Sequence, residues 1–131
     1  MKYMVQVFGN RETWDADMAS YSPESVRAMI AHMGRLNDEL VKNGEFVQAE
    51  GLGGPSLVTS VSARNGAGPD VTAGPHLRAE KILAGYWVID VESEARAIEF
   101  AAQVSAAPGP DGTPSNEPVE IHAVPSGPPE V

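Results

Sequence analysis

The order of its β-rich and helical segments constrains the fold of this chain more than any other feature. Two strand–helix–strand units follow one another, and a hairpin separates them. Four segments carry the β-forming residues or the apolar alternation that predict strands: Lys2–Phe8, Glu45–Glu50, Ala84–Val91 and Val119–Val124. This order predicts an α+β fold of the ferredoxin-like, split βαβ type, in which two helices cover one face of an antiparallel sheet.

The first helix has the clearest start and stop signals. Ser22 can cap it, Pro23 suits the first helical position, and Glu24 suits the positive end of the helix dipole. Apolar residues then recur at helical spacing and form one stripe: Val26, Met29, Ile30, Met33, Leu36, Leu40 and Val41. Gly44 is expected to end this helix, and a second helix is expected over about Glu92–Ala106.

Glycine and asparagine mark the expected turns. Gly9-Asn10 is a turn signal that should end the first strand, and residues 9–21 are expected to be irregular. Asn65-Gly66 predicts a hairpin between Leu57–Arg64 and Val71–Thr72, because both turn residues must accept positive φ. The inserted hairpin separates the two strand–helix–strand units.

The length of 131 residues suits one domain. Residues 108–118 are rich in Pro, Gly and Ser and predict a loop before the last strand. Residues 125–131 (PSGPPEV) predict a disordered tail. We therefore expect a single domain over residues 1–124, followed by that tail.

The predicted sheet has helices on one side only, so its other face needs a cover. A second copy of the same sheet is the simplest cover, and it would produce a homodimer of the kind known as a dimeric α/β barrel. The cavity between two such sheets is a natural place for a small ligand.

Charge and composition restrict the class of partner. Nine Lys and Arg residues against eighteen Asp and Glu residues give a net charge of −9, which argues against nucleic acid and anionic membrane surfaces as partners. The chain has no cysteine, so disulfides, thiolate metal sites and cysteine nucleophiles are ruled out. The N-terminus is too short and polar for a signal peptide, so a cytoplasmic location is expected.

Three stretches resemble the YCII-related family in its DGPF subgroup: KYMVQVFGN, LVKNGEFVQAEGLGG (Leu40–Gly54) and VTAGPHLRAEKILAGYWVIDV. The likeness covers roughly residues 1–124. The third stretch stands where the family carries a DGPFAETKE-like motif, and Gly74 and Pro75 match it. Ala73 replaces the opening acid, His76 replaces the aromatic residue, and residues 77–81 also depart from the motif. Agreement returns in the following strand, at Gly85, Ile89, Asp90 and Val91.

The resemblance implies a ferredoxin-like α+β dimer and leaves the function open. Many members of the family have no assigned activity. Some look like small-molecule enzymes such as lyases or dehydrochlorinases, and others are similar to proteins associated with extracytoplasmic sigma factors.

Strand alternation selects the candidate site residues. If the apolar residues face the helices, the uncovered face carries a mixed polar set: Met4, Gln6, Tyr86, Asp90, Glu120 and His122. Antiparallel pairing is expected to put Asp90, Met4 and His122 in one row, with the outer two about 10 Å apart. His122 would be a general base, because imidazole changes charge within the physiological pH range. Asp90 or Glu120 would orient it or act as a second acid, whereas solvated surface side chains are the simpler alternative.

Residues elsewhere add weaker candidates. His76 and Arg78, in the Gly-Pro loop, could bind a carboxylate or phosphate, or could simply be exposed. Asn37 interrupts the apolar stripe of the first helix, so its amide needs a partner: sheet backbone, a buried water or a ligand. His32 lies near the edge of the same stripe, next to Leu36.

These residues favour cofactor-independent acid–base chemistry on a small organic molecule: isomerisation, elimination or cyclisation. The proposed catalytic residues are His122, Asp90 and His76. The proposed substrate-binding residues are Tyr86, Arg78, Glu120, Gln6 and Asn37. The three histidines lack metal-ligand spacing and there is no phosphate loop, so neither a metal nor a cofactor is expected. The alternative is a non-catalytic interaction or regulatory module, for example a partner in sigma-factor regulation.

Overall fold

The computed structural model describes residues 1–64 and 66–130, and in them the chain forms an α+β fold. Its elements in chain order are β1 (Lys2–Asn10), α1 (Trp14–Ala19), α2 (Pro23–Lys42), β2 (Phe46–Gly51), a 3-10 turn (Pro55–Leu57), β3 (Thr59–Ser62), β4 (Asp70–Ala73), β5 (Lys81–Asp90), α3 (Glu94–Ser105) and β6 (Glu120–Val124). Four strands form an antiparallel sheet in the order β2-β5-β1-β6, and β3 pairs with β4. The predicted ferredoxin-like architecture is confirmed.

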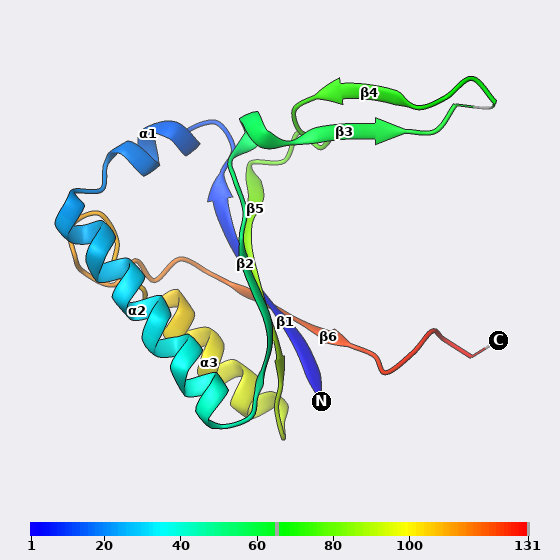
Figure 1. The fold of residues 1–131 in the computed structure, drawn as a ribbon. Helices are drawn as coiled ribbons and strands as arrows, with labels where there is room; N and C mark the ends of the chain where they lie inside the picture. Colours follow the sequence, from blue (N-terminus) through cyan, green and yellow to red (C-terminus); the bar gives the residue numbers. More distant parts are fainter. Residues whose placement is uncertain (65, 131) are drawn as a thin grey trace.

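The elements are arranged asymmetrically about the sheet. Helices α2 and α3 lie side by side on one face (Figure 1). The β3–β4 hairpin projects from one end of the sheet toward the other side, and the segment after β6 leaves on that same side (Figure 1). We call the face without helices the open face.

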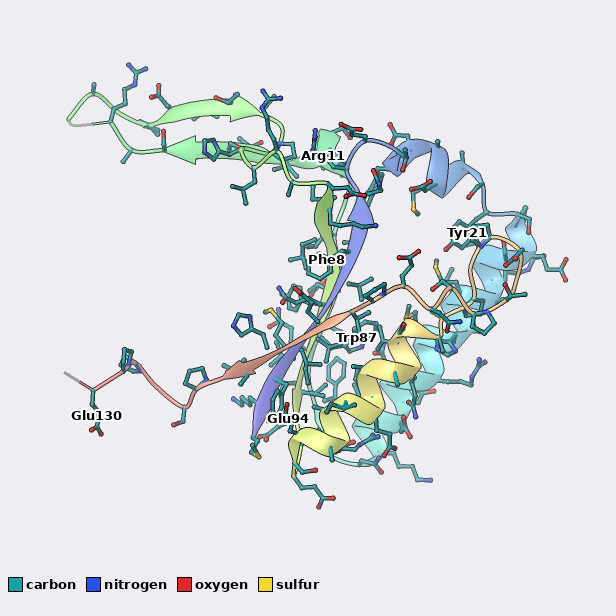
Figure 2. The ribbon with its side chains drawn as sticks, turned by 180° about the vertical axis from the view of Figure 1, so that it is seen from behind. Phe8, Arg11, Tyr21, Trp87, Glu94 and Glu130 are labelled. Atoms are coloured by element: carbon teal, nitrogen blue, oxygen red, sulfur yellow. The ribbon has the colours of Figure 1, made fainter. Side chains whose placement is uncertain are left out.

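The hydrophobic core lies between the sheet and the two long helices. Tyr3, Val5, Trp87 and Ile89 are buried on the helix side of β1 and β5. The helices contribute six of the remaining buried residues: Leu36, Leu40, Ala97, Phe100, Ala101 and Val104. The rings of Trp87 and Phe100 meet edge to face, with centroids 5.7 Å apart and planes at 78°. Figure 2 shows Trp87 between the strands and the helices.

Helix α2 begins and ends as its sequence predicts. Ser22 accepts a hydrogen bond from the Ser25 amide at 3.0 Å, and the Ser25 hydroxyl accepts one from the Ser22 amide at 2.8 Å. Gly44 follows the helix with φ of 71°, a conformation that favours glycine. The prediction of the apolar stripe is wrong at two positions, since Ile30 and Val41 are 61% and 63% exposed. They lie beside the stripe that Leu36 and Leu40 define.

The segment after the first strand is more regular than its sequence suggests. β1 continues through Gly9 and Asn10, which pair with Ile82 and Lys81 because β5 begins earlier than expected. Residues 14–19 form the short helix α1. The Trp14 ring packs so closely on Gly9 that a Cβ there would lie 2.5 Å from it. Close approach of an aromatic ring, rather than a turn, therefore explains this glycine.

The inserted hairpin is confirmed, since Thr59–Ser62 pairs with Asp70–Ala73. Asn65, the first residue of the expected turn, lies outside the described residues. Near the tip, Arg64 Nε and Asp70 Oδ1 form an ion pair at 2.7 Å. Within the described part of the chain, no helix is long and apolar enough to cross a membrane.

Candidate functional site

The register of the sheet builds a first row of polar side chains on the open face. Gln6 of β1 pairs with Tyr86 of β5 on one side and Glu120 of β6 on the other. Glu50 of β2 extends the row beyond Tyr86. Because neighbouring strands lie about 4.8 Å apart, Tyr86 and Glu120 face each other across Gln6 at a backbone separation of about 10 Å.

A second row, two residues along each strand, mixes apolar and polar side chains. Met4 pairs with Val88 on one side and His122 on the other, and Gln48 lies beyond Val88. Met4 and Val88 are half-buried, whereas His122 is exposed at the edge of the sheet. The open face therefore has an apolar centre with an imidazole beside it.

Residues of both rows line a shallow depression of about 480 Å³, formed by Gln6, Glu120, Ile121 and His122. Glu120 and His122 point the same way because they are two residues apart on β6. A molecule in this depression would meet an amide, a carboxylate and an imidazole. These groups can donate and accept hydrogen bonds and can exchange protons.

The Tyr86 hydroxyl is held by one side-chain hydrogen bond from β2. Gln48 Nε2 donates to the Tyr86 hydroxyl at 2.8 Å. The phenol oxygen accepts this bond, so its own O–H remains free to donate to a ligand. Sequence reasoning missed Gln48 and Glu50, although the alternation of the predicted second strand puts both on one face.

The expected row of Asp90, Met4 and His122 is wrong. Asp90 pairs with Lys2, one step further along the sheet, and Met4 pairs with Val88 instead. The Asp90 carboxylate binds the amino group of Met1 at 3.0 Å, with both groups more than half exposed. Within one chain, Asp90 therefore neutralises the N-terminus and does not line the depression at His122.

His76 and Arg78 lie at the base of the hairpin, in the segment after β4, and both are exposed. They line a second groove with residues of the hairpin strands, including Ser60, Asp70 and Thr72. Neither lines the depression at His122. The structure thus places the three expected catalytic residues, His122, Asp90 and His76, at three different positions in one chain.

Asn37 and His32 make contacts on the helix side of the molecule. The Trp87 indole Nε1 donates to Asn37 Oδ1 at 2.8 Å, which joins α2 to β5. The sequence predicted sheet backbone, a buried water or a ligand as the partner of Asn37. The partner is instead the side chain of a core residue, Trp87. His32 Nε2 lies 2.8 Å from the backbone oxygen of Gln103, which joins α2 to α3. Both side chains are thereby held in structural contacts between elements.

The described residues contain no group of three His, Asp or Glu side chains that could hold a metal ion. The open face offers instead the amides of Gln6 and Gln48, the phenol of Tyr86, the carboxylates of Glu50 and Glu120, and the imidazole of His122. This set can bind a neutral polar molecule and transfer a proton by itself.

Comparison with known proteins gives one result that bears on this site. Residues 1–110 match the model of the YCII-related domain. The match runs from β1 through α3 and therefore includes Gln6, Gln48 and Tyr86, whereas β6 with Glu120 and His122 lies beyond it. No curated protein matches the sequence.

Proposed function

Because the chain belongs to the YCII-related domain family, we propose that it is a small-molecule enzyme that uses cofactor-independent acid–base chemistry on the open face of its sheet. The observation that supports this most directly is the depression that Gln6, Glu120 and His122 line on the open face, with Tyr86 paired to Gln6 on the next strand. We also assign the chain to the DGPF subgroup, on the Gly74-Pro75 pair; Gly74 has φ of 93°, which favours glycine.

In the proposed reaction, His122 removes a proton from a carbon next to a carbonyl group. The electron pair of the broken C–H bond moves onto the carbonyl oxygen and leaves an enolate. The Tyr86 O–H donates to that oxygen, since the phenol oxygen already accepts from Gln48. Return of the proton to another carbon gives isomerisation, and departure of a neighbouring group gives elimination. Both reactions conserve atoms and electrons, so neither needs an oxidant or a reductant.

We propose that a second copy of the chain covers the open face. Met4 and Val88 leave an apolar centre on that face, and one layer of helices covers only the other side. A two-fold arrangement would bring two depressions together and remove water from them. Val88→Asp is expected to convert a dimer into a monomer in sedimentation velocity. Ile98→Asp, on the 54% exposed outer side of α3, is the matched control and should leave the oligomeric state unchanged.

The chemistry is tested by isotope exchange. The protein is incubated in D₂O with acetoacetate, oxaloacetate and 2-oxobutyrate, and deuterium at the carbon next to the carbonyl is followed by NMR. We expect exchange above the buffer rate for at least one compound, and a loss of about a hundredfold or more in His122→Gln. His32→Gln, which changes a histidine on the helix side, should retain the rate.

Two outcomes would contradict the proposal. One is exchange at the buffer rate with every compound, which would favour a non-catalytic binding or regulatory module. The other is exchange that His122→Gln leaves intact, which would move the chemistry to another site.

A further inference from the structure

A separate groove of about 580 Å³ lies where the hairpin leaves the sheet. Phe8 of β1 lines it, together with Leu57 before β3 and Leu77 after β4. Leu57 and Leu77 are 78% and 74% exposed, so this apolar surface is open to a ligand. Figure 2 shows Phe8 on the side of the sheet away from the helices, and Arg11 near the base of the hairpin. The volume is within the range of roughly 300–1,000 Å³ that small-molecule sites occupy.

The charges around the groove differ in sign from those of the whole chain. Arg11, His76 and Lys81 all line it, and no Asp or Glu does so among the described residues. The chain as a whole carries nine Lys and Arg residues against eighteen Asp and Glu residues. A positive lining in such an acidic chain points to an anionic occupant.

Contacts within the described chain engage Arg11 in part and leave Lys81 without an ion pair. Arg11 Nε donates to the backbone oxygen of Ala79 at 2.9 Å, which fixes the guanidinium at the groove. Its Nη2 lies 3.5 Å from the carboxylate of Glu12, a side chain that is 76% exposed. In the described part of the chain, no carboxylate forms an ion pair with Lys81 or His76. The groove thus combines an anchored guanidinium with a free ammonium.

We propose that this groove binds a small amphipathic carboxylate, an alkyl or aryl acid whose apolar part lies along Phe8, Leu57 and Leu77. Its carboxylate would lie between Arg11 and Lys81. The inference depends only on residues of the groove and does not require the acid–base chemistry at His122. The two sites are neighbours, however, because Phe8 and Lys81 also line a small depression that Glu117 and Glu120 border.

The test uses octanoate as the probe and octanamide as its neutral match. Octanoate should bind saturably at one site per chain and shift the amide resonances of Phe8, Leu57, Leu77 and Lys81. Octanamide should bind roughly tenfold more weakly, because it lacks the charge. Raising the salt concentration should weaken octanoate binding and leave octanamide binding nearly unchanged.

Matched variants separate charge from apolar contact. Lys81→Met should weaken octanoate binding about threefold to tenfold without affecting octanamide. Leu77→Asn should weaken the binding of both probes. Lys42→Met at the end of α2 and Ile98→Asn on α3 are the controls, and they should bind both probes as the unchanged protein does.

The inference would be overturned by a lack of saturable binding, by resonance shifts away from the groove, or by equal losses of binding in Lys81→Met and Lys42→Met. Protection of the groove amides in a dimer without ligand would also overturn it, because a second copy would then fill the groove. His122→Gln should still bind octanoate. If His122→Gln loses isotope exchange but still binds octanoate, the result supports the role of His122 in proton transfer and shows that the groove binds independently of it.

Discussion

His32 and His122 lie on opposite sides of the same sheet, and their contacts differ. His32 joins α2 to the backbone of α3 at 2.8 Å, whereas His122 is exposed on β6 beside a depression. The amides show the same difference. Asn37 accepts the indole N–H of a core tryptophan, whereas Gln6 faces the depression on the open side.

Cationic side chains differ in the same way between the helix side and the open side. Arg96 of α3 binds Glu45 through Nε at 3.0 Å and Nη2 at 2.8 Å, and both side chains are nearly buried. Lys81, on the other side, is exposed and lines an apolar groove. Residue type therefore does not separate the groups held in structural contacts from the candidate functional groups of this chain. The two sets differ in whether the side chain binds a partner within the chain.

The largest expected effect contrasts two phenylalanines. Phe100 is fully buried and packs edge to face on Trp87, so Phe100→Ala should lower the free energy of unfolding by about 3–5 kcal/mol. Phe8 is only partly buried on the open side, and Phe8→Ala should cost about 1 kcal/mol. Urea denaturation at low protein concentration measures both. Equal losses would mean that the open side is packed as tightly as the core.

The Arg96–Glu45 pair gives the next largest effect. Arg96→Met should lower the free energy of unfolding by about 2–3 kcal/mol at pH 7, because it leaves a nearly buried carboxylate without its partner. The hydrogen bond from Arg96 holds the pKa of Glu45 below its ordinary value. This stabilisation is therefore present above the ordinary carboxylate pKa, and it is lost as the pH falls through the lowered pKa of the folded state.

The pH dependence supplies the control for this prediction. The difference in stability between the unchanged protein and Arg96→Met should shrink from pH 7 to pH 3. Lys81→Met on the open side should change stability by less than about 0.5 kcal/mol at either pH. A difference that stays constant with pH would mean that Arg96 acts through its packing and not through the Glu45 charge.

The fold was predictable because its signals are local. The cap at Ser22, the αL residue Gly44 and the alternation of four strands fix the order of the elements, and that order defines the topology. The error at Gly9-Asn10 has a tertiary cause. β5 begins early enough to pair with this segment, and the Trp14 ring packs closely on Gly9. Neither contact can be seen in a local window of the sequence.

The sheet face on which the candidate residues lie was predictable, but the row in which each one lies was not. Alternation assigned Gln6, Tyr86, Glu120 and His122 to the open face, and the register agrees. Asp90 was placed one row away from its true position, because the alternation within each strand does not determine how two strands that are distant in sequence pair with each other. The groove at the hairpin base could not be predicted, since residues from β1, β5 and both ends of the hairpin meet there only in three dimensions.

The smallest expected effect contrasts the two histidines directly. His32→Gln should lower the free energy of unfolding by about 1 kcal/mol, because it disturbs the bond to the Gln103 carbonyl between two packed helices. His122→Gln should change it by less than about 0.5 kcal/mol, because that ring is exposed on an edge strand. Urea denaturation of both variants measures the difference, with their isotope-exchange rates measured alongside. A stability loss at His122 as large as that at His32 would show that the edge imidazole also makes a structural contact. The proposed difference in role between the helix histidine and the strand histidine would then be wrong.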